Sequence, residues 1–248
     1  MTSVYDESHK KLLQELRSMR LSGMAEALEA QLQDANSNLK SFSERIYEIV
    51  NTEWELRYSK KYNRFLKKAA LKYPAADIDQ SIYDADRLLD TNAIEQLATC
   101  RWIDERRNLL VTGSTGSGKT YISNALCVSA LRQFKTVRYT KANHLIYELE
   151  QARIANEYLT CTRKLTELDL LVIDDFGLME LDLDKCRNLF EVIDGRDSSR
   201  STMIISQLPI SSWYEIFKDS TYADACMDRI IHNAYRLEFN GRNMRNPT

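Results

Sequence analysis

One short segment in the middle of the chain has the residue types and spacing needed to bind phosphate. Residues 113–120 have the sequence Gly-Ser-Thr-Gly-Ser-Gly-Lys-Thr, and an apolar strand and a helix are expected on its two sides. Glycines let backbone N–H groups turn inward toward phosphate oxygens, and the N-terminus of the following helix favours the same anions. In a loop of this pattern, the Walker A loop, the lysine reaches the β- and γ-phosphates and the last hydroxyl binds Mg²⁺.

The pattern therefore predicts ATP and Mg²⁺ as cofactors, with Thr120 as a metal ligand. The residues expected to bind the nucleotide are Gly113, Ser114, Thr115, Gly116, Ser117, Gly118, Lys119, Thr120 and Tyr121.

A second motif supplies carboxylates. Residues 170–173 are apolar and predict a buried parallel strand, and Asp174 and Asp175 follow at its carboxyl end, where ligands bind in open α/β sheets. We expect Asp174 to hold Mg²⁺ through water and Asp175 to orient and polarise the attacking water. An apolar strand that ends in two acids is common, so this Walker B interpretation depends on the preceding Walker A loop.

A third apolar strand, residues 201–206, ends in Ser206 and is followed by Gln207. If the sheet inserts this strand between the Walker A and Walker B strands, Ser206 or Gln207 contacts the γ-phosphate or the attacking water. A polar cap on the strand end is an equally good explanation of these residues.

The elements around the motifs predict the fold class, an α/β domain with a parallel sheet sandwiched by helices, preceded by an all-helical part. Strands at 109–112, 136–139, 168–173 and 201–206 alternate with helices at 119–133, 142–155 and 185–196, which is typical of parallel sheets. Before residue 98, apolar residues recur at helical spacing. A helix is expected from the capping box Ser41–Glu44 to about Lys72, before Tyr73-Pro74, and a short one over 93–99.

These elements divide the chain into three parts. We predict a helical DNA-binding and oligomerisation domain at 1–75, a linker with a helix at 76–100, and a nucleotide-binding domain at 101–248.

The predicted long helix carries a stripe of positive charge, and no acid occurs between Glu55 and Asp77. At about 100° per residue its cations fall within an arc of roughly 140°, so they can neutralise several backbone phosphates of a nucleic acid. The alternative is a solvated charged face, although a stripe of one sign is unusual in a chain of net charge −2. The predicted DNA-binding residues are Arg57, Lys60, Lys61, Arg64, Lys67, Lys68 and Lys72.

Composition excludes several classes of protein. The chain has 248 residues, of which 44% are hydrophobic and 28% charged, as in ordinary globular proteins. No two of the five cysteines lie closer than 25 residues, which excludes a CxxC zinc or redox motif. No apolar run approaches the roughly 18 residues of a membrane span, and the N-terminus has no signal-peptide pattern. A cytoplasmic protein without a membrane partner is therefore expected.

With these motifs in place, the chain resembles IstB, the helper ATPase of insertion-sequence transposition, an AAA+ protein related to DnaC-type helicase loaders. The resemblance covers nearly the whole chain and is most specific after the third strand. The residues that carry it are Met19–Leu28, Phe42–Arg45, Glu53, Arg57, Ser206–Pro209, Trp213, Ala223–Ala225, Asp228–Ala234, Gly241 and Met244–Arg245.

The resemblance implies a P-loop AAA+ fold and roles for further residues. Gln207, with Ser206, matches the sensor-1 position, and Arg229 matches the arginine that AAA+ proteins project into a neighbour's nucleotide site, which requires a homo-oligomer. The implied catalytic residues are Lys119, Asp175, Gln207 and Arg229. A salt bridge to Asp228 or another nearby acid is the structural alternative for Arg229.

Weaker candidates remain open. Arg196 and Arg200 could also reach a neighbour, and Arg242 and Arg245 could replace a sensor-2 arginine. Only 41 residues follow Gln207, so a lid is expected to be absent or truncated. Members of the family often end the Walker B strand in Asp-Glu, whereas this chain has Asp174-Asp175. The aspartate side chain is one methylene group shorter than glutamate, so we expect it to position water less well and hydrolysis to be slow.

The predicted function is an ATP-dependent, sequence-independent DNA-binding AAA+ ATPase that oligomerises on double-stranded DNA as a ring, spiral or filament and assists a transposase. A helicase loader that prefers single strands is the nearest alternative, followed by a small-molecule kinase and a nucleotide-gated DNA scaffold that hardly hydrolyses ATP. Further candidates for DNA contact in the nucleotide-binding domain are Arg132, Lys135, Arg138 and Lys141.

Overall fold

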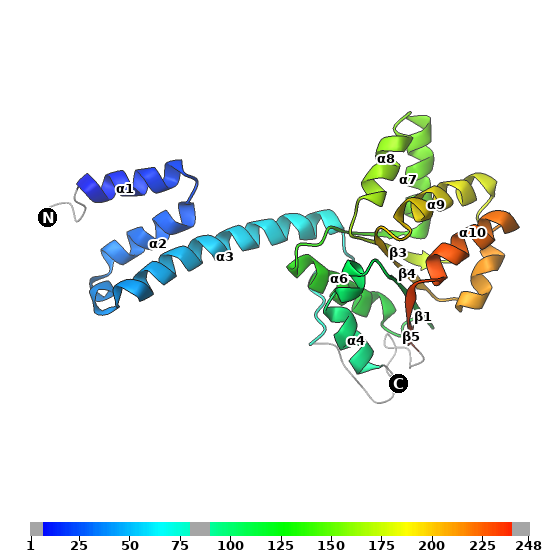
Figure 1. Ribbon diagram of the computed structural model, residues 1–248, viewed down its shortest axis with the longest axis horizontal. Helices are drawn as coiled ribbons and strands as arrows, with labels where there is room; N and C mark the ends of the chain where they lie inside the picture. Colours follow the sequence, from blue (N-terminus) through cyan, green and yellow to red (C-terminus); the bar gives the residue numbers. More distant parts are fainter. Residues whose placement is uncertain (1–6, 80–89, 240–248) are drawn as a thin grey trace. The chain divides into compact units, whose positions relative to one another are not determined.

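The computed structural model describes residues 7–79 and 90–239 (Figure 1). The chain separates into two compact units, Met1–Arg64 and Phe65–Thr248. Among the described helices, none is long and apolar enough to cross a membrane. The functional domains predicted at 1–75, 76–100 and 101–248 remain predictions.

The first unit is helical, as predicted. Its elements are α1 (Glu7–Ser18), α2 (Ser22–Gln33), the 3-10 helix η1 (Ala35–Leu39) and the first part of α3 (Phe42–Ala69). Leu13 and Leu16 of α1 pack on Ala25 of α2, and the predicted capping box starts α3, since the Glu44 carboxylate accepts the Ser41 N–H at 2.8 Å.

A buried carboxylate joins α2 to α3. Glu53 accepts the backbone N–H groups of Gly23 at 2.7 Å and Met24 at 3.2 Å, which satisfies two free donors at the start of α2. Although burial alone would raise its pKa, hydrogen bonds from the Arg57 guanidinium and from the two N–H groups lower the pKa of Glu53. A side chain on Gly23 would place its Cβ 2.9 Å from the Glu53 Cα, so close packing requires glycine there.

The long helix ends earlier than predicted. It stops at Ala69 because Ala70 adopts φ +52°, a left-handed conformation that ends helices. Lys72 therefore lies beyond the helix, and its assignment to the helical stripe was wrong.

The second unit contains a five-stranded parallel sheet, which confirms the predicted fold class. Its strands are β1 (Asn108–Gly113), β2 (Val137–Lys141), β3 (Leu170–Phe176), β4 (Ser201–Ser206) and β5 (Ala234–Phe239), in the order β2-β3-β4-β1-β5. β4 lies between the Walker A and Walker B strands, the arrangement on which the role of Gln207 depends. β5 was not predicted, because an edge strand with half of its residues exposed gives a weak apolar signal.

Helices cover both faces of this sheet (Figure 1). One face carries α6 (Lys119–Arg132), with α4 (Thr91–Ala98) and α5 (Arg101–Asp104) beside it. The other carries α7 (Ala142–Ile154), α8 (Tyr158–Thr166), α9 (Leu183–Arg196), η3 (Ile210–Ile216) and α10 (Ser220–Ile231).

The last elements bear on the predicted lid. Of the residues after Gln207, those described, up to Phe239, form η3, α10 and β5 and no separate helical lid. Arg242 and Arg245 lie outside the described residues.

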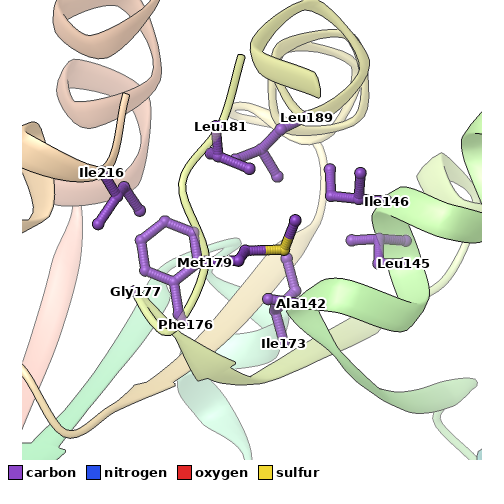
Figure 2. A pocket seen from close by; sticks show the side chains of 10 residues that line it. All are labelled: Ala142, Leu145, Ile146, Ile173, Phe176, Gly177, Met179, Leu181, Leu189 and Ile216. Atoms are coloured by element: carbon purple, nitrogen blue, oxygen red, sulfur yellow. The ribbon is translucent and has the colours of Figure 1, made fainter. Parts of the chain in front are cut away.

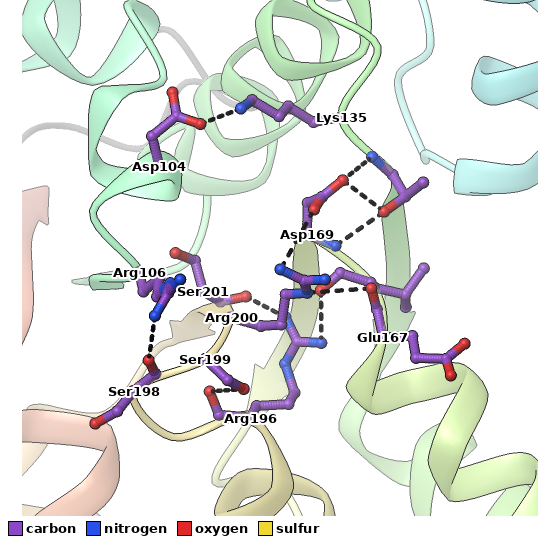
Figure 3. Close-up of polar contacts among 12 residues, drawn as sticks. Asp104, Arg106, Lys135, Glu167, Asp169, Arg196, Ser198, Ser199, Arg200 and Ser201 are labelled. Carbon is purple, nitrogen blue, oxygen red and sulfur yellow. Dashed lines mark hydrogen bonds and ion pairs between the residues drawn. The ribbon is translucent and has the colours of Figure 1, made fainter.

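A buried arginine connects α9 to the neighbouring elements (Figure 3). The Arg196 guanidinium, in a residue only 1% exposed, donates to the carbonyls of Leu165 at 2.5 Å and Leu168 at 3.0 Å, to the Ser201 carbonyl, and to the Thr202 hydroxyl at 3.0 Å. Burial lowers the pKa of Arg196 to about 9, which still leaves it protonated at neutral pH. The suggestion that Arg196 reaches a neighbouring subunit was therefore wrong, because its side chain is enclosed.

Replacing Arg196 by leucine should destabilise the second unit. Two buried carbonyls, one partly buried carbonyl and a hydroxyl would lose their donor, at about 3 kcal/mol of unfolding free energy in total. Arg200→Leu is the matched control, since this neighbouring arginine is exposed and contacts the Glu167 carbonyl at 3.2 Å; we expect it to cost less than about 1 kcal/mol. Urea unfolding followed by circular dichroism measures both, and equal losses would contradict a special role for Arg196.

Candidate nucleotide-binding site

The predicted phosphate loop connects β1 to α6. Gly116 and Gly118 have φ +80° and +94°, conformations that favour glycine, and α6 begins directly afterwards at Lys119. Gly113 is needed for a different reason, because a Cβ there would lie 2.3 Å from the carbonyl oxygen of Phe239 on β5. The loop thus presents backbone amides and a helix N-terminus at the carboxyl end of the sheet.

Polar groups of the loop are positioned for a phosphate. The Lys119 ammonium, in a largely buried residue, donates to the carbonyls of Gly113 and Ser114 at 2.6 Å each. The Ser117 hydroxyl oxygen is buried without a hydrogen-bond partner among the described residues. An unsatisfied buried donor and an ammonium beside a helix N-terminus fit the oxygens of a triphosphate.

The two predicted metal ligands lie together. Thr120 on α6 donates its hydroxyl to the Asp174 carboxylate on β3 at 3.1 Å, and Asp174 is buried. No group of three His, Cys, Asp or Glu residues that could hold a metal occurs in the described part of the chain. One hydroxyl and one carboxylate fit Mg²⁺ that is otherwise bound by phosphate and water, since this ion keeps several non-protein ligands.

Two residues of β2 that were not predicted for this site contact the Walker B carboxylates. In the register of the sheet, Tyr139 lies beside Val172 and Lys141 beside Asp174. The Tyr139 hydroxyl donates to Asp174 at 2.5 Å, and the Lys141 ammonium lies 2.7 Å from an Asp175 oxygen. Their proximity follows from the strand order, which no local motif encodes.

These contacts change the titration of both side chains. Burial, together with the hydrogen bond to Asp174, raises the pKa of the Tyr139 hydroxyl far above its usual value. The hydrogen bond to the Asp175 carboxylate raises the pKa of the Lys141 ammonium. Tyr139 is therefore a neutral donor and Lys141 a cation throughout the physiological pH range.

Asp175 sits on a distorted end of β3. Its φ is +58°, uncommon outside glycine, and the register to β4 shifts between Ile173 and Phe176. Its N–H donates to the Asp174 carboxylate at 2.7 Å. Two contacts thus hold the residue predicted to orient water. Its carboxylate pairs with Lys141, and its backbone N–H is hydrogen-bonded to Asp174.

The end of β4 separates the two polar candidates there. Gln207 lies next to the phosphate loop, where its side-chain oxygen accepts the Thr115 hydroxyl at 2.6 Å. Ser206 instead donates to the Phe176 carbonyl at 2.6 Å and accepts the N–H of Leu208 at 3.1 Å. Ser206 therefore caps the strand, Gln207 is the residue that contacts the phosphate loop, and a contact of Gln207 with the γ-phosphate remains a prediction.

Tyr121 contacts the segment that precedes α4. Its hydroxyl accepts the N–H of Asp77 at 3.4 Å, and its ring centroid lies 5.9 Å from that of Tyr73. Asn124 accepts the Tyr73 N–H at 3.1 Å. Residues 73–77 are thus held along α6, and contact of Tyr121 with a nucleotide remains a prediction.

Arg229 lies at the opposite end of the sheet. It lines a cavity of about 270 Å³ together with Asn108, which is the first residue of β1. The phosphate loop lies at the other end of this strand, after its last residue, Gly113. Its guanidinium pairs with Asp194 at 2.7 Å and lies 4.9 Å from the Phe190 ring centroid. The salt-bridge alternative is thus realised within the subunit, although with Asp194 and not Asp228.

A small apolar pocket behind β3 is not a ligand site (Figure 2). Its cavity volume is about 10 Å³, no more than one water molecule occupies. Figure 2 shows the Met179 side chain among the apolar residues of α7, β3, α9 and η3 that line this pocket. The pocket is therefore a small gap in the apolar packing between the loop after the Walker B strand and its neighbours.

The predicted DNA-binding side chains are exposed or partly exposed at all seven positions. Arg57 also has a structural role, because it pairs with Glu53 at 2.5 Å and donates to the Arg20 carbonyl at 3.1 Å. The four cations of the second unit considered for DNA contact each pair with an acid. These pairs are Arg132–Asp77, Lys135–Asp104, Arg138–Glu148 and Lys141–Asp175.

Solved structures share the fold of the second unit. DnaI superposes with a TM-score of 0.57 at 19% identity, over 73% of this chain and 93% of that one. DnaA of Aquifex aeolicus bound to AMPPCP gives 0.56 at 15% identity, over 69% and 52%. At these identities the similarity shows a common AAA+ fold and nothing further.

Relatives found by sequence share a higher identity with this chain than these two solved structures do. An insertion-sequence ATP-binding protein of Sinorhizobium fredii is 36% identical over 94% of this chain and 95% of its own length. The IS1162 ATP-binding protein of Pseudomonas fluorescens is 38% identical, over 81% and 87%. The family model described as IstB-like ATP binding protein matches residues 14–248. This chain, with its phosphate loop and Walker B strand, therefore belongs to the IstB-like family of insertion-sequence ATP-binding proteins.

Proposed function

We propose that this protein is a Mg²⁺-dependent ATPase that assembles on double-stranded DNA and assists the transposase of an insertion sequence. The observation that carries the ATPase proposal is the convergence of Lys119, Thr120 and Asp174 at one end of the sheet, with Gln207 beside the loop. Membership of a family of insertion-sequence ATP-binding proteins supports the link to transposition.

The chain's own residues account for the steps of hydrolysis. Lys119 would exchange its two carbonyl acceptors for the β- and γ-phosphate oxygens, and Thr120 and Asp174 would hold Mg²⁺. When bound, the ion would supply positive charge against the transferred phosphate. Gln207, held by Thr115, faces the same phosphate, and Asp175 orients the attacking water after it separates from Lys141.

Arg229 makes the proposed site a shared one. Because it lies at the end of β1 away from the phosphate loop of its own subunit, it can act only on a neighbour's nucleotide. To do so, it must exchange Asp194 for phosphate oxygens. ATP favours assembly only by the difference in its affinity for the two states, and this exchange supplies a difference.

DNA binding is proposed for the exposed cations of the α3 region. They can contact backbone phosphates without reading bases, so binding should depend on salt and not on sequence. A nucleotide-gated scaffold with slow turnover is the second candidate. The Lys141–Asp175 ion pair favours it, since this pair restrains the residue that orients water. A helicase loader stays an alternative that preference for single strands would support.

Lys119→Ala should abolish ATP binding and ATP-stimulated assembly, because no other loop side chain replaces the ammonium. Multi-angle light scattering with and without ATP-Mg²⁺ measures assembly. Lys164→Ala, which removes an exposed lysine of α8, should assemble as the unaltered protein does. Normal assembly of Lys119→Ala with ATP would refute the proposed scheme.

Arg229→Ala should lower hydrolysis by roughly 1000-fold while ATP still binds, as expected for an arginine supplied in trans. Mixing it with Lys119→Ala gives a sharper measurement, since each variant lacks a different half of the shared site. Hybrid interfaces should recover part of the ATPase activity. Two variants that stay inactive when mixed would argue against a shared site.

Changing Arg64 and Lys68 to glutamate should weaken DNA binding at least about 10-fold and reduce the slope of log K against log salt by about 2, with ATP affinity unchanged. Mobility shifts on mixed-sequence duplex and single-stranded DNA measure both. Lys10→Glu with Lys11→Glu gives the same charge change on α1 and should have a smaller effect. Equal effects of the two pairs would remove the special role of the stripe.

A further inference from the structure

Tyr139 carries a buried hydroxyl for which the proposed hydrolysis steps give no role. It lies on β2, its residue is 8% exposed, and its hydroxyl donates to the Asp174 carboxylate at 2.5 Å. On the neighbouring strand β3, Tyr139 is paired with Val172, which lies two residues before Asp174. The hydroxyl therefore reaches forward along β3 to the carboxyl end, where the metal ligands lie.

The hydrogen bonds of Asp174 show what this donor does. An ionised carboxylate offers about four acceptor positions, and three are filled: by the hydroxyls of Tyr139 and Thr120 on one oxygen and the N–H of Asp175 on the other. The Thr120 hydroxyl must reorient when its oxygen binds a metal, and the Asp175 N–H depends on a strained backbone. Tyr139 is the side-chain donor that can keep its hydrogen bond to Asp174 both without and with a bound metal.

We propose that Tyr139 is a positioning residue for the metal ligand Asp174 and thereby sets the affinity of the site for Mg²⁺. This inference rests on the proposed function. A hydrogen bond from outside the coordination sphere fixes the orientation of a ligating carboxylate. Loss of such a partner typically weakens metal binding about 10- to 100-fold.

The alternative explanation is packing, in which only the ring of Tyr139 matters. Tyr139→Phe separates the two, because it keeps the ring and removes only the hydroxyl. The matched control is Tyr147→Phe on α7, which removes the hydroxyl of a side chain that is 62% exposed.

The experiment titrates Mg²⁺ against a fixed concentration of a fluorescent ATP analogue and the full-length protein. We expect Tyr139→Phe to raise the Mg²⁺ concentration at half-saturation by about 10- to 100-fold. Analogue affinity in EDTA should stay as in the unaltered protein, the thermal midpoint without nucleotide should fall by only a few degrees because one buried hydrogen bond is lost, and Tyr147→Phe should change none of these values. Unchanged or tighter Mg²⁺ dependence in Tyr139→Phe would overturn the inference.

Two further measurements keep the result interpretable. If Tyr139→Phe weakens the affinity for the analogue in EDTA by the same factor by which it raises the half-saturating Mg²⁺ concentration, the role is structural and the inference is wrong. Mn²⁺ relaxivity with ATP reports metal binding without hydrolysis and should show the same weakening. If the unaltered protein itself binds the analogue without any response to Mg²⁺, the proposed function fails before Tyr139 is tested.

Discussion

The hydrogen bond from Thr120 to Asp174, 3.1 Å long, joins two elements that are distant in the sheet. Thr120 lies in the first turn of α6, which follows β1, whereas Asp174 lies near the carboxyl end of β3, and β4 lies between these strands. The bond requires that β1 and β3 run in the same direction, so that their carboxyl ends lie at the same edge of the sheet. Strand order, helix direction and the conformation of the phosphate loop are therefore all constrained by one pair of oxygen atoms.

The same arrangement places negative charges close together at the carboxyl edge of the sheet. Asp174 and Asp175 are adjacent there, and a bound triphosphate would add further negative charge. β2 places two different donors against these carboxylates, the neutral Tyr139 and the cationic Lys141. A neutral donor leaves the charge of Asp174 available to a metal, whereas an ammonium neutralises Asp175. The same strand thus favours metal binding at one carboxylate and restrains the other.

The sequence was sufficient where chemistry is local. The glycine spacing of the phosphate loop, the apolar run before Asp174 and the alternation of strands and helices each predict the observed element. It was insufficient where partners depend on tertiary packing. Tyr139 carries no signal until β2 is known to border β3, and Arg196 resembled an exposed candidate until its carbonyl acceptors were found. The end of α3 was missed because a single alanine adopts a left-handed conformation.

In the proposed reaction, Arg229 would complete the site of a neighbouring subunit. Within the subunit its guanidinium is satisfied by Asp194 at the end of the sheet away from the phosphate loop. Exchange of that carboxylate for a neighbour's phosphate would make nucleotide affinity and subunit affinity depend on each other, and such a dependence is reciprocal. A ligand that aligns subunits, as proposed for DNA, would then raise the affinity for ATP by the same factor by which ATP raises the affinity for that ligand.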